Sequence, residues 1–231
     1  MYEYKVRAKM TANDAARLID ISAVQAYHGK KEIDELVSFA KKYRFISVHT
    51  LPSWTRYLSK ALSDSPDILV GAPVGFPSGG AHIKTKVFEA GQLIEDGVQE
   101  MDMVLNIGKL KSGDYAYVLE EIRQVRAVGK GLPLKVILET NYLSPEEIKV
   151  GCEICIEAGA DFVKTGTGWA LGGTTVDTIR MIKEIVGHRI KVKASGGIRD
   201  IDTFRQMLDL GVDRFGMNVL TSVEIVQSFD K

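Results

Sequence analysis

The sequence predicts a (β/α)8 barrel, an α/β fold in which eight parallel strands alternate with helices. Three observations support it: eight strand-like runs that start roughly 20 to 35 residues apart, amphipathic helical patterns between them, and a length of 231 residues. That length suits one barrel domain, and an open doubly wound sheet more often has five or six strands. We therefore expect residues 1–231 to form one domain.

The strand-like runs are short apolar segments, and the first seven end in glycine, serine or threonine. They span residues 17–22, 45–50, 67–75, 101–108, 134–140, 161–168, 190–197 and 213–219. Strands that alternate with helices favour a parallel sheet whose outer face is covered by those helices.

Amphipathic helical patterns fill the gaps between the runs. Four of them are explicit, at residues 30–43, 113–129, 144–160 and 174–187. Apolar side chains recur three or four residues apart, as in the stripes that begin with Ile33 and Leu36 and with Tyr115. The third pattern opens with Ser144 and Glu147, the spacing of a capping box.

Composition narrows the class of protein. Lys plus Arg equals Asp plus Glu at 30 each, so no net basic field favours nucleic acid or an anionic membrane as a partner. No apolar run approaches the roughly 18 residues that would span a bilayer. The start, MYEYKVRAKM, lacks the apolar core of a secretory signal, and we expect a cytoplasmic protein.

Two lysines stand where predicted strands run into glycine-containing turns. Lys164 lies in the sixth run and Lys193 in the seventh, each just before its small and glycine residues, so both belong at the carboxyl end of the barrel, where active sites form. Burial and a neighbouring positive charge both favour a neutral lysine, which can attack a carbonyl and form a Schiff base. The alternative is that each lysine reaches solvent, or that one pairs with Asp161 or Asp200.

Asp102 is the carboxylate most clearly placed to serve these lysines. In the fourth run, Asp102, Val104 and Asn106 share one face of a strand. If that face looks inward, the carboxylate needs a cationic or hydrogen-bonding partner, and the two lysines supply it. An outward face would bury Asp102 under a helix instead.

The glycines after the predicted strands indicate a phosphate site, though weakly, because strand-to-helix turns need glycine for backbone reasons. Gly168 closes the sixth run, and Gly196 and Gly197 close the seventh. Barrel phosphate sites are commonly built from such loops and a helix N-terminus.

Two further patterns point to other chemistry. His28, His49 and His82 fall in or beside the connections after the first three runs and could bind zinc, although their spacing matches no ligand motif. Cys152 and Cys155 spell C-x-x-C but lie in the middle of a predicted helix, which favours packing against the barrel over redox chemistry.

The motifs together resemble the deoxyribose-phosphate aldolase family, which are class I aldolases. The resemblance is nearly continuous from residue 67 to 216, and it is carried by VGFPSGG, LIEDGVQEMDMV, MDMVLNIGKLKSGDYAYV, LKVILET, GADFVKTGTG and VKASGGIRD. It implies a barrel fold and no metal or organic cofactor. Relatives often form homodimers or homotetramers.

The resemblance also implies residue roles. Lys164 matches the Schiff-base lysine, Lys193 the second lysine that lowers its pKa, and Asp102 the carboxylate that relays protons. Further residues that it places near the substrate are Asp20, His49, Phe76, Thr165, Gly168, Trp169, Gly196, Gly197 and Asn218.

The implied reaction is reversible cleavage of 2-deoxyribose 5-phosphate, or a related 2-deoxy sugar, to acetaldehyde and glyceraldehyde 3-phosphate. The chain departs from the family pattern in several places, three of which lie near the implied site. KTSTG is KTGTG here and is followed by Trp169, His49 stands about where many members have a cysteine, and residues 217–219 replace a serine pair that helps to hold phosphate. The alternatives are a different or unphosphorylated aldose, or a non-catalytic sugar-binding paralogue.

Overall fold

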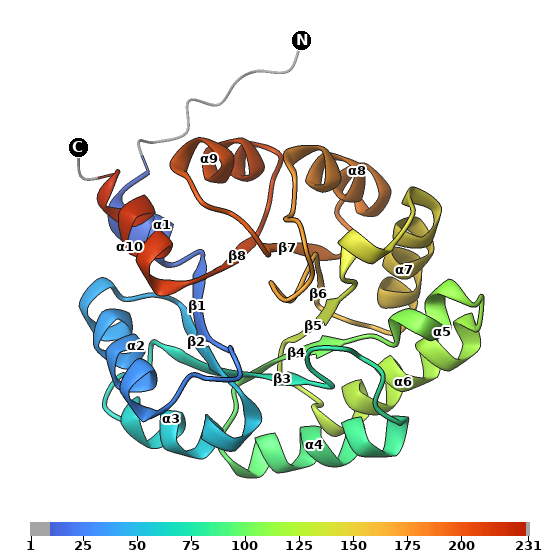
Figure 1. The fold of residues 1–231 in the computed structure, drawn as a ribbon, viewed down its shortest axis with the longest axis horizontal. Coiled ribbons are helices and arrows are strands. Elements are labelled where there is room, and N and C mark those ends of the chain that lie inside the picture. The colour runs from blue at the N-terminus through green and yellow to red at the C-terminus, as the bar shows by residue number, and fades with distance from the viewer. Residues whose placement is uncertain (1–9, 230–231) are drawn as a thin grey trace.

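The computed structural model describes residues 10–229. Within them, eight parallel strands pair in sequence order and the eighth pairs with the first, which closes a barrel. Figure 1 shows the strands at the centre and the helices as an outer ring. The predicted (β/α)8 fold is confirmed. Most of the polar start, residues 1–9, and the last two residues lie outside the described part.

The strands are shorter than the predicted runs. They are β1 (Ile19–Ala23), β2 (Ser47–Thr50), β3 (Leu69–Val74), β4 (Glu100–Val104), β5 (Leu134–Ile137), β6 (Phe162–Lys164), β7 (Lys191–Ser195) and β8 (Arg214–Met217). The difference is largest at β6, where the loop that follows turns at Gly168 with φ of +80°, a conformation that glycine adopts without steric cost. Lys164 is therefore the last residue of its strand.

Helices cover the barrel between successive strands. They are α1 (Ala12–Ala16), α2 (Lys30–Tyr43), α3 (Thr55–Ala61), α4 (Ile83–Glu95), α5 (Ile107–Lys111), α6 (Tyr115–Val128), α7 (Pro145–Glu157), α8 (Val176–Val186), α9 (Ile201–Asp209) and α10 (Val219–Gln227), with 3-10 turns η1 (Pro52–Trp54) and η2 (Thr140–Tyr142). The predicted capping box of Ser144 and Glu147 begins α7. Within residues 10–229, no helix is long and apolar enough to cross a membrane.

The apolar stripes of the helices pack on the outer face of the barrel. Ile33 and Leu36 of α2 are buried as predicted. Tyr115 is not: it is 44% exposed, because it begins α6 and the helix meets the barrel only from Val118 onward.

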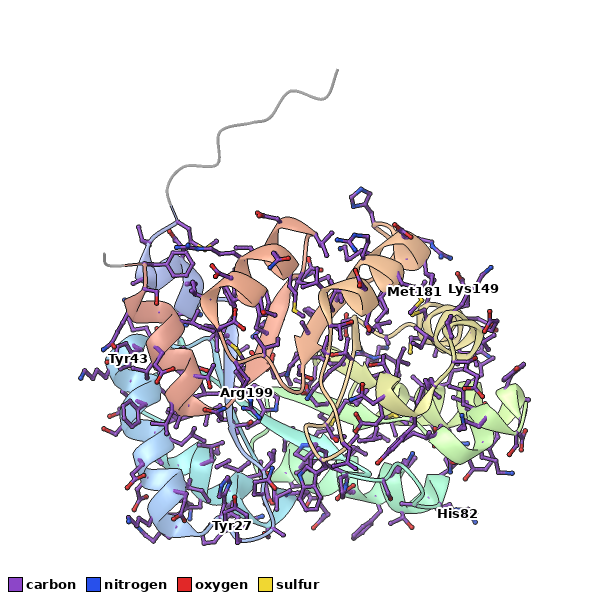
Figure 2. The ribbon with its side chains drawn as sticks, turned by 45° about the horizontal axis from the view of Figure 1, so that its top comes forward. Tyr27, Tyr43, His82, Lys149, Met181 and Arg199 are labelled. Carbon is purple, nitrogen blue, oxygen red and sulfur yellow. The ribbon has the colours of Figure 1, made fainter. Side chains whose placement is uncertain are left out.

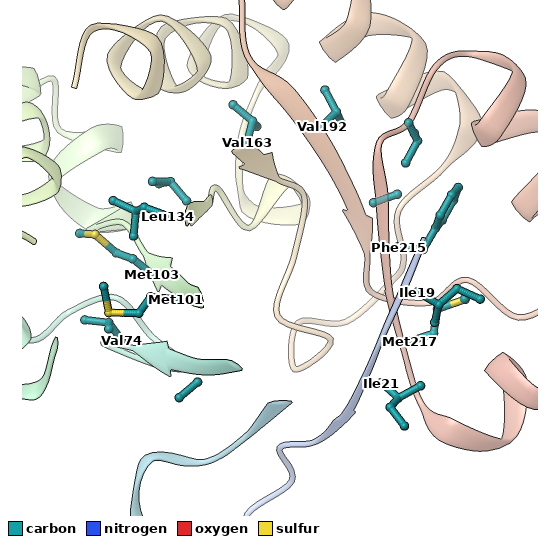
Figure 3. Packing of buried hydrophobic residues seen from close by; sticks show 14 of the residues in the cluster. Ile19, Ile21, Val74, Met101, Met103, Leu134, Val163, Val192, Phe215 and Met217 are labelled. Carbon is teal, nitrogen blue, oxygen red and sulfur yellow. The ribbon is translucent and has the colours of Figure 1, made fainter. Parts of the chain in front are cut away.

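Side chains alternate along each strand between this apolar shell and a polar interior. On β4, Met101 and Met103 pack under the helices, while Glu100 and Asp102 point to the other face. Figure 3 shows the outward apolar side chains, with Val163 and Val192 contributed by β6 and β7. Full burial of each such side chain contributes about 1.5–3 kcal/mol, which stabilises a barrel whose interior is charged.

Cys152 and Cys155 lie on α7 and are both buried in the apolar shell. Burial raises the pKa of the Cys152 thiol to about 12 and raises that of Cys155 as well. Both thiols are therefore protonated at neutral pH, and the predicted packing role is confirmed.

Candidate active site

A cavity opens at the carboxyl ends of the strands, where barrels of this kind hold their active sites. Its lining includes these residues that the sequence singled out: Asp20, His49, Phe76, Asp102, Lys164, Gly168, Lys193, Gly196, Gly197 and Asn218. Thr165 and Trp169 are not part of the lining. The prediction that the two lysines and Asp102 face one space is therefore confirmed in geometry.

Asp102 binds both lysines through one oxygen. Its Oδ2 lies 2.6 Å from Nζ of Lys164 and 2.6 Å from Nζ of Lys193. Lys193 also contacts Oδ2 of Asp20 at 2.6 Å. Gly216 on β8 makes this packing possible, because a Cβ there would lie only 3.1 Å from Cε of Lys193.

The environment favours a neutral Lys164. Burial lowers the pKa of Lys164 to about 8; the Asp102 carboxylate opposes this shift, and the positive charges of Lys193 and Lys135 add to it. Burial is the larger cause, whereas the sequence emphasised the charge of Lys193. For Asp102, burial alone would raise the pKa, but Lys135, Lys164 and Lys193 together hold it well below its usual value.

Sequence reasoning missed three buried charged residues in the barrel interior: Glu100, Lys135 and Arg214. Lys135 on β5 lies 2.8 Å from Oε1 of Glu100 and 3.2 Å from Oδ1 of Asp102. Arg214 on β8 donates a hydrogen bond of 2.6 Å to Oδ1 of Asp20. Strand alternation could have found Glu100, which lies two residues before Asp102 and therefore on the same face.

The interior network balances when one lysine loses its proton. Three carboxylates meet four basic side chains there: Asp20, Glu100 and Asp102 with Lys135, Lys164, Lys193 and Arg214. Burial alone would raise the pKa of Glu100, but Lys135 and His49 help to lower it to about 2. The pKa of Lys135 is raised, because three carboxylates outweigh its burial. Lys164, the lysine whose pKa falls, is therefore suited to be the neutral member.

The three histidines considered for zinc do not converge. His82 caps α4, where its Nδ1 accepts a hydrogen bond from Lys84 N at 3.2 Å, and Figure 2 shows it far from Tyr27, the neighbour of His28. In the described part of the chain, His49 groups with Asp20 and Glu100 instead.

That alternative group is also poorly suited to a metal ion. His49 Nε2 lies 3.0 Å from Oε1 of Glu100, and the same oxygen is 2.8 Å from Nζ of Lys135. Asp20 is paired with Lys193 and Arg214. Lysine and arginine already neutralise both carboxylates, and an added cation would face their charges.

One side of the cavity is suited to an anion. Gly196 and Gly197 line it together with Arg199, an exposed residue that the sequence analysis did not select although it follows the glycine pair. Arg199 is labelled in Figure 2. Asn218 lines the same side, but its Oδ1 caps α10 by accepting from Thr221 N at 3.0 Å. Its side chain is thus largely committed to the helix.

Thr165 is buried and Trp169 is partly exposed, and both adjoin residues that line the cavity. The Thr165 hydroxyl donates to the carbonyl of Ser195 at 2.8 Å and links β6 to β7. The Trp169 indole donates to Val24 O at 3.2 Å and packs edge-on against Phe76, with ring centroids 5.9 Å apart. Their contact with a substrate stays a prediction.

Comparisons with known proteins identify the family of the chain. The sequence pattern of "DeoC/LacD family aldolase" matches residues 10–220. A deoxyribose-phosphate aldolase from Klebsiella pneumoniae is 49% identical over 210 residues, which cover 90% of this chain and 84% of the relative. A deoxyribose-phosphate aldolase from Rhizobium meliloti is 46% identical over 220 residues, which cover 95% of this chain and 89% of the relative.

Solved structures agree as well. The structure of QR15, an aldolase, matches with a TM-score of 0.88 at 40% identity, over 94% of this chain and 96% of that one. The tetrameric deoxyribose phosphate aldolase from Aeropyrum pernix matches with a TM-score of 0.87 at 27% identity. The match covers 96% of this chain and 93% of that one. The chain belongs to the DeoC/LacD family of aldolases and is a carbon–carbon lyase.

Proposed function

We propose that the chain is a class I aldolase that cleaves 2-deoxyribose 5-phosphate to acetaldehyde and glyceraldehyde 3-phosphate through a Schiff base on Lys164. The observation that carries this proposal is the ion pair between Lys164 and Asp102. The Nζ atoms of Lys164 and Lys193 each lie 2.6 Å from the same oxygen, Oδ2 of Asp102, and the pKa of Lys164 is lowered to about 8. Relatives at 46–49% identity are deoxyribose-phosphate aldolases.

The first step is attack by neutral Lys164 on C1 of the open-chain aldehyde. The carbinolamine that forms loses water and becomes an iminium ion, which is the electron sink of the reaction. Asp102 and Lys193 move the protons of this step: the carboxylate can accept a proton from the amine, and Lys193 can donate one to the departing hydroxyl.

Carbon–carbon cleavage follows. Asp102 and Lys193 together act as the base that removes the proton of the 3-hydroxyl. The C2–C3 bond then breaks, and its electron pair moves to the iminium to give an enamine. Glyceraldehyde 3-phosphate leaves. The enamine is then protonated at C2, and water hydrolyses the imine to release acetaldehyde and free Lys164.

The phosphate end of the substrate fits the side of the cavity formed by Gly196, Gly197 and Arg199. Backbone N–H groups and a guanidinium are groups that bind phosphate. A second candidate substrate is an unphosphorylated 2-deoxy sugar. Its support is the commitment of the Asn218 side chain to α10, which leaves few side-chain donors on that side.

We also propose that the chain assembles as a homodimer or homotetramer; the support is the tetrameric structure of the Aeropyrum pernix relative. Light scattering at several protein concentrations would measure the mass of the particle. A monomer at all concentrations would contradict the proposal.

A borohydride trap tests the chemistry. Wild-type protein incubated with acetaldehyde and borohydride should gain one ethyl group on Lys164, located by peptide mass spectrometry. Lys164→Ala should gain no stoichiometric adduct at the site and should lose cleavage activity. Labelling of Lys193 with Lys164 unmodified would overturn the assignment.

A further inference from the structure

Glu139, which follows β5, has an unusual backbone for its residue type. Its φ and ψ are 56° and 62° in the left-handed region, where a side chain is strained. Its neighbours hold it there: Leu138 N donates to Lys164 O and Thr140 N donates to Thr165 O, each at 2.9 Å. Glu139 thus lies against the end of the strand that carries Lys164.

The Glu139 side chain is buried, with 3% exposure, and in residues 10–229 no salt bridge joins it to a basic group. Its partners lie in the loop after β6. Thr167 N donates to Oε2 at 3.1 Å and to Oε1 at 3.3 Å, and the Thr167 hydroxyl also donates to Oε2.

The hydrogen bonds continue along the loop. The Thr167 hydroxyl oxygen accepts a hydrogen bond from Trp169 N at 3.0 Å. The hydroxyl hydrogen of Thr167 is then the one donated to Glu139. Gly166 completes the fit, because a Cβ there would lie 2.8 Å from Oε1 of Glu139. The glycine at 166 is therefore explained by the space that this carboxylate occupies.

We infer that Glu139 is a positioning residue for the aldolase reaction: its carboxylate fixes the loop that follows Lys164. Two residues of that loop, Thr167 and Gly168, line the cavity beside Lys164. The strained backbone aims the carboxylate at Thr167, and the hydrogen bonds hold the loop against the substrate. This inference rests on the proposed function.

A double-mutant cycle tests it. Glu139→Gln keeps size and shape, but both carboxylate oxygens accept from Thr167 N, and in either orientation of the amide one of them is replaced by an NH2 donor. We expect kcat for 2-deoxyribose 5-phosphate to fall roughly 10- to 100-fold, because a displaced loop misplaces the bound substrate. Thr167→Val should lower kcat similarly, and the double variant should be little worse than either, since both remove one interaction.

Arg44 provides a matched control, because within residues 10–229 it is the other non-glycine residue with a positive φ, also 56°, and it is exposed at the end of α2. Arg44→Gly should leave kcat unchanged. Melting temperatures within a few degrees of wild type would show that Glu139→Gln does not act by unfolding the protein. A Glu139→Gln variant within twofold of wild type, fully additive losses in the cycle, or a loss of kcat that only follows loss of folded protein would overturn the inference.

The borohydride trap separates this inference from the proposed function. If wild type labels Lys164 and Glu139→Gln labels it too but turns over slowly, both stand. If wild type does not label Lys164, the proposed function fails, whereas the cycle still reports whether Glu139 and Thr167 act together. If wild type labels and the cycle shows no coupling, only the inference about Glu139 fails.

Discussion

Lys164 and Lys193 occupy paired positions on β6 and β7, and both Nζ atoms lie 2.6 Å from one oxygen, Oδ2 of Asp102. Two ammonium groups on one carboxylate oxygen leave an excess positive charge, which favours loss of a proton from one of them. Burial adds to this effect at Lys164. The pairing therefore supplies an amine that is partly neutral near neutral pH and a carboxylate that stays charged beside it.

The pH dependence of imine formation follows from the pKa of Lys164, about 8. Only the neutral amine attacks a carbonyl, so the rate should rise with pH through about 8 and level off above it. At pH 7 about a tenth of the lysine is neutral. Initial rates of borohydride trapping with acetaldehyde from pH 6 to 10 would measure this curve. A midpoint near 10.5 would mean that Lys164 is not perturbed.

Removal of the neighbouring charge should move that curve upward. In Lys193→Leu, Lys164 loses a cation that lowers its pKa and keeps Asp102, which raises it. Burial remains, so the midpoint should rise without reaching the ordinary value for lysine. The same trapping experiment checks this, with Lys60→Leu, an exposed lysine on α3, as the control. An unchanged midpoint would remove Lys193 from this role.

Stability should depend on Glu100 in acid. Its pKa is lowered in the folded protein to about 2 from 4.5, so the folded state keeps it charged where the unfolded chain becomes protonated. The stabilisation is present above pH 4.5 and is lost as pH falls toward 2, a change of about 3 kcal/mol. Urea unfolding at several pH values would measure it.

Glu100→Gln checks the assignment. This variant should lose part of the acid dependence, and it should be destabilised at pH 7 by about 3–5 kcal/mol, because Lys135 remains buried without its closest partner. Wild-type unfolding free energy that stays constant from pH 5 to 2.5 would contradict the prediction.

The sequence predicted the strand order and the meeting of Lys164, Lys193 and Asp102, because strand periodicity and strand ends are local signals. It did not predict Lys135 or Arg214, since a lysine or arginine in a strand has the same local pattern whether it faces solvent or an acid on another strand. The meeting of Lys135 with Glu100 depends on barrel closure and register, which no single segment encodes.

The loops were harder to predict than the strands for a related reason. Trp169 and Thr165 were expected near the substrate, yet their side chains bind Val24 and Ser195. Asn218 lines the cavity, but its side chain also caps α10, and its contact with the substrate stays a prediction. A polar side chain at a loop position can serve the backbone or a ligand, and the local sequence does not distinguish the two.

The preference for a phosphorylated substrate should depend on Arg199. The guanidinium is exposed at the side of the cavity that contains Gly196 and Gly197, and a charge-assisted bond to phosphate contributes about 1.5–3 kcal/mol. Arg199→Met should therefore lower kcat/KM for 2-deoxyribose 5-phosphate by roughly 10- to 100-fold and leave kcat/KM for 2-deoxyribose nearly unchanged. Arg205→Met, on the exposed face of α9, is the control and should change neither value.

Equal loss for both substrates would show that Arg199 supports the fold of the loop. If wild type shows no preference between the two substrates, the unphosphorylated sugar becomes the better assignment. In that case neither the backbone of the glycine pair nor the capped Asn218 binds phosphate strongly enough to affect the rate.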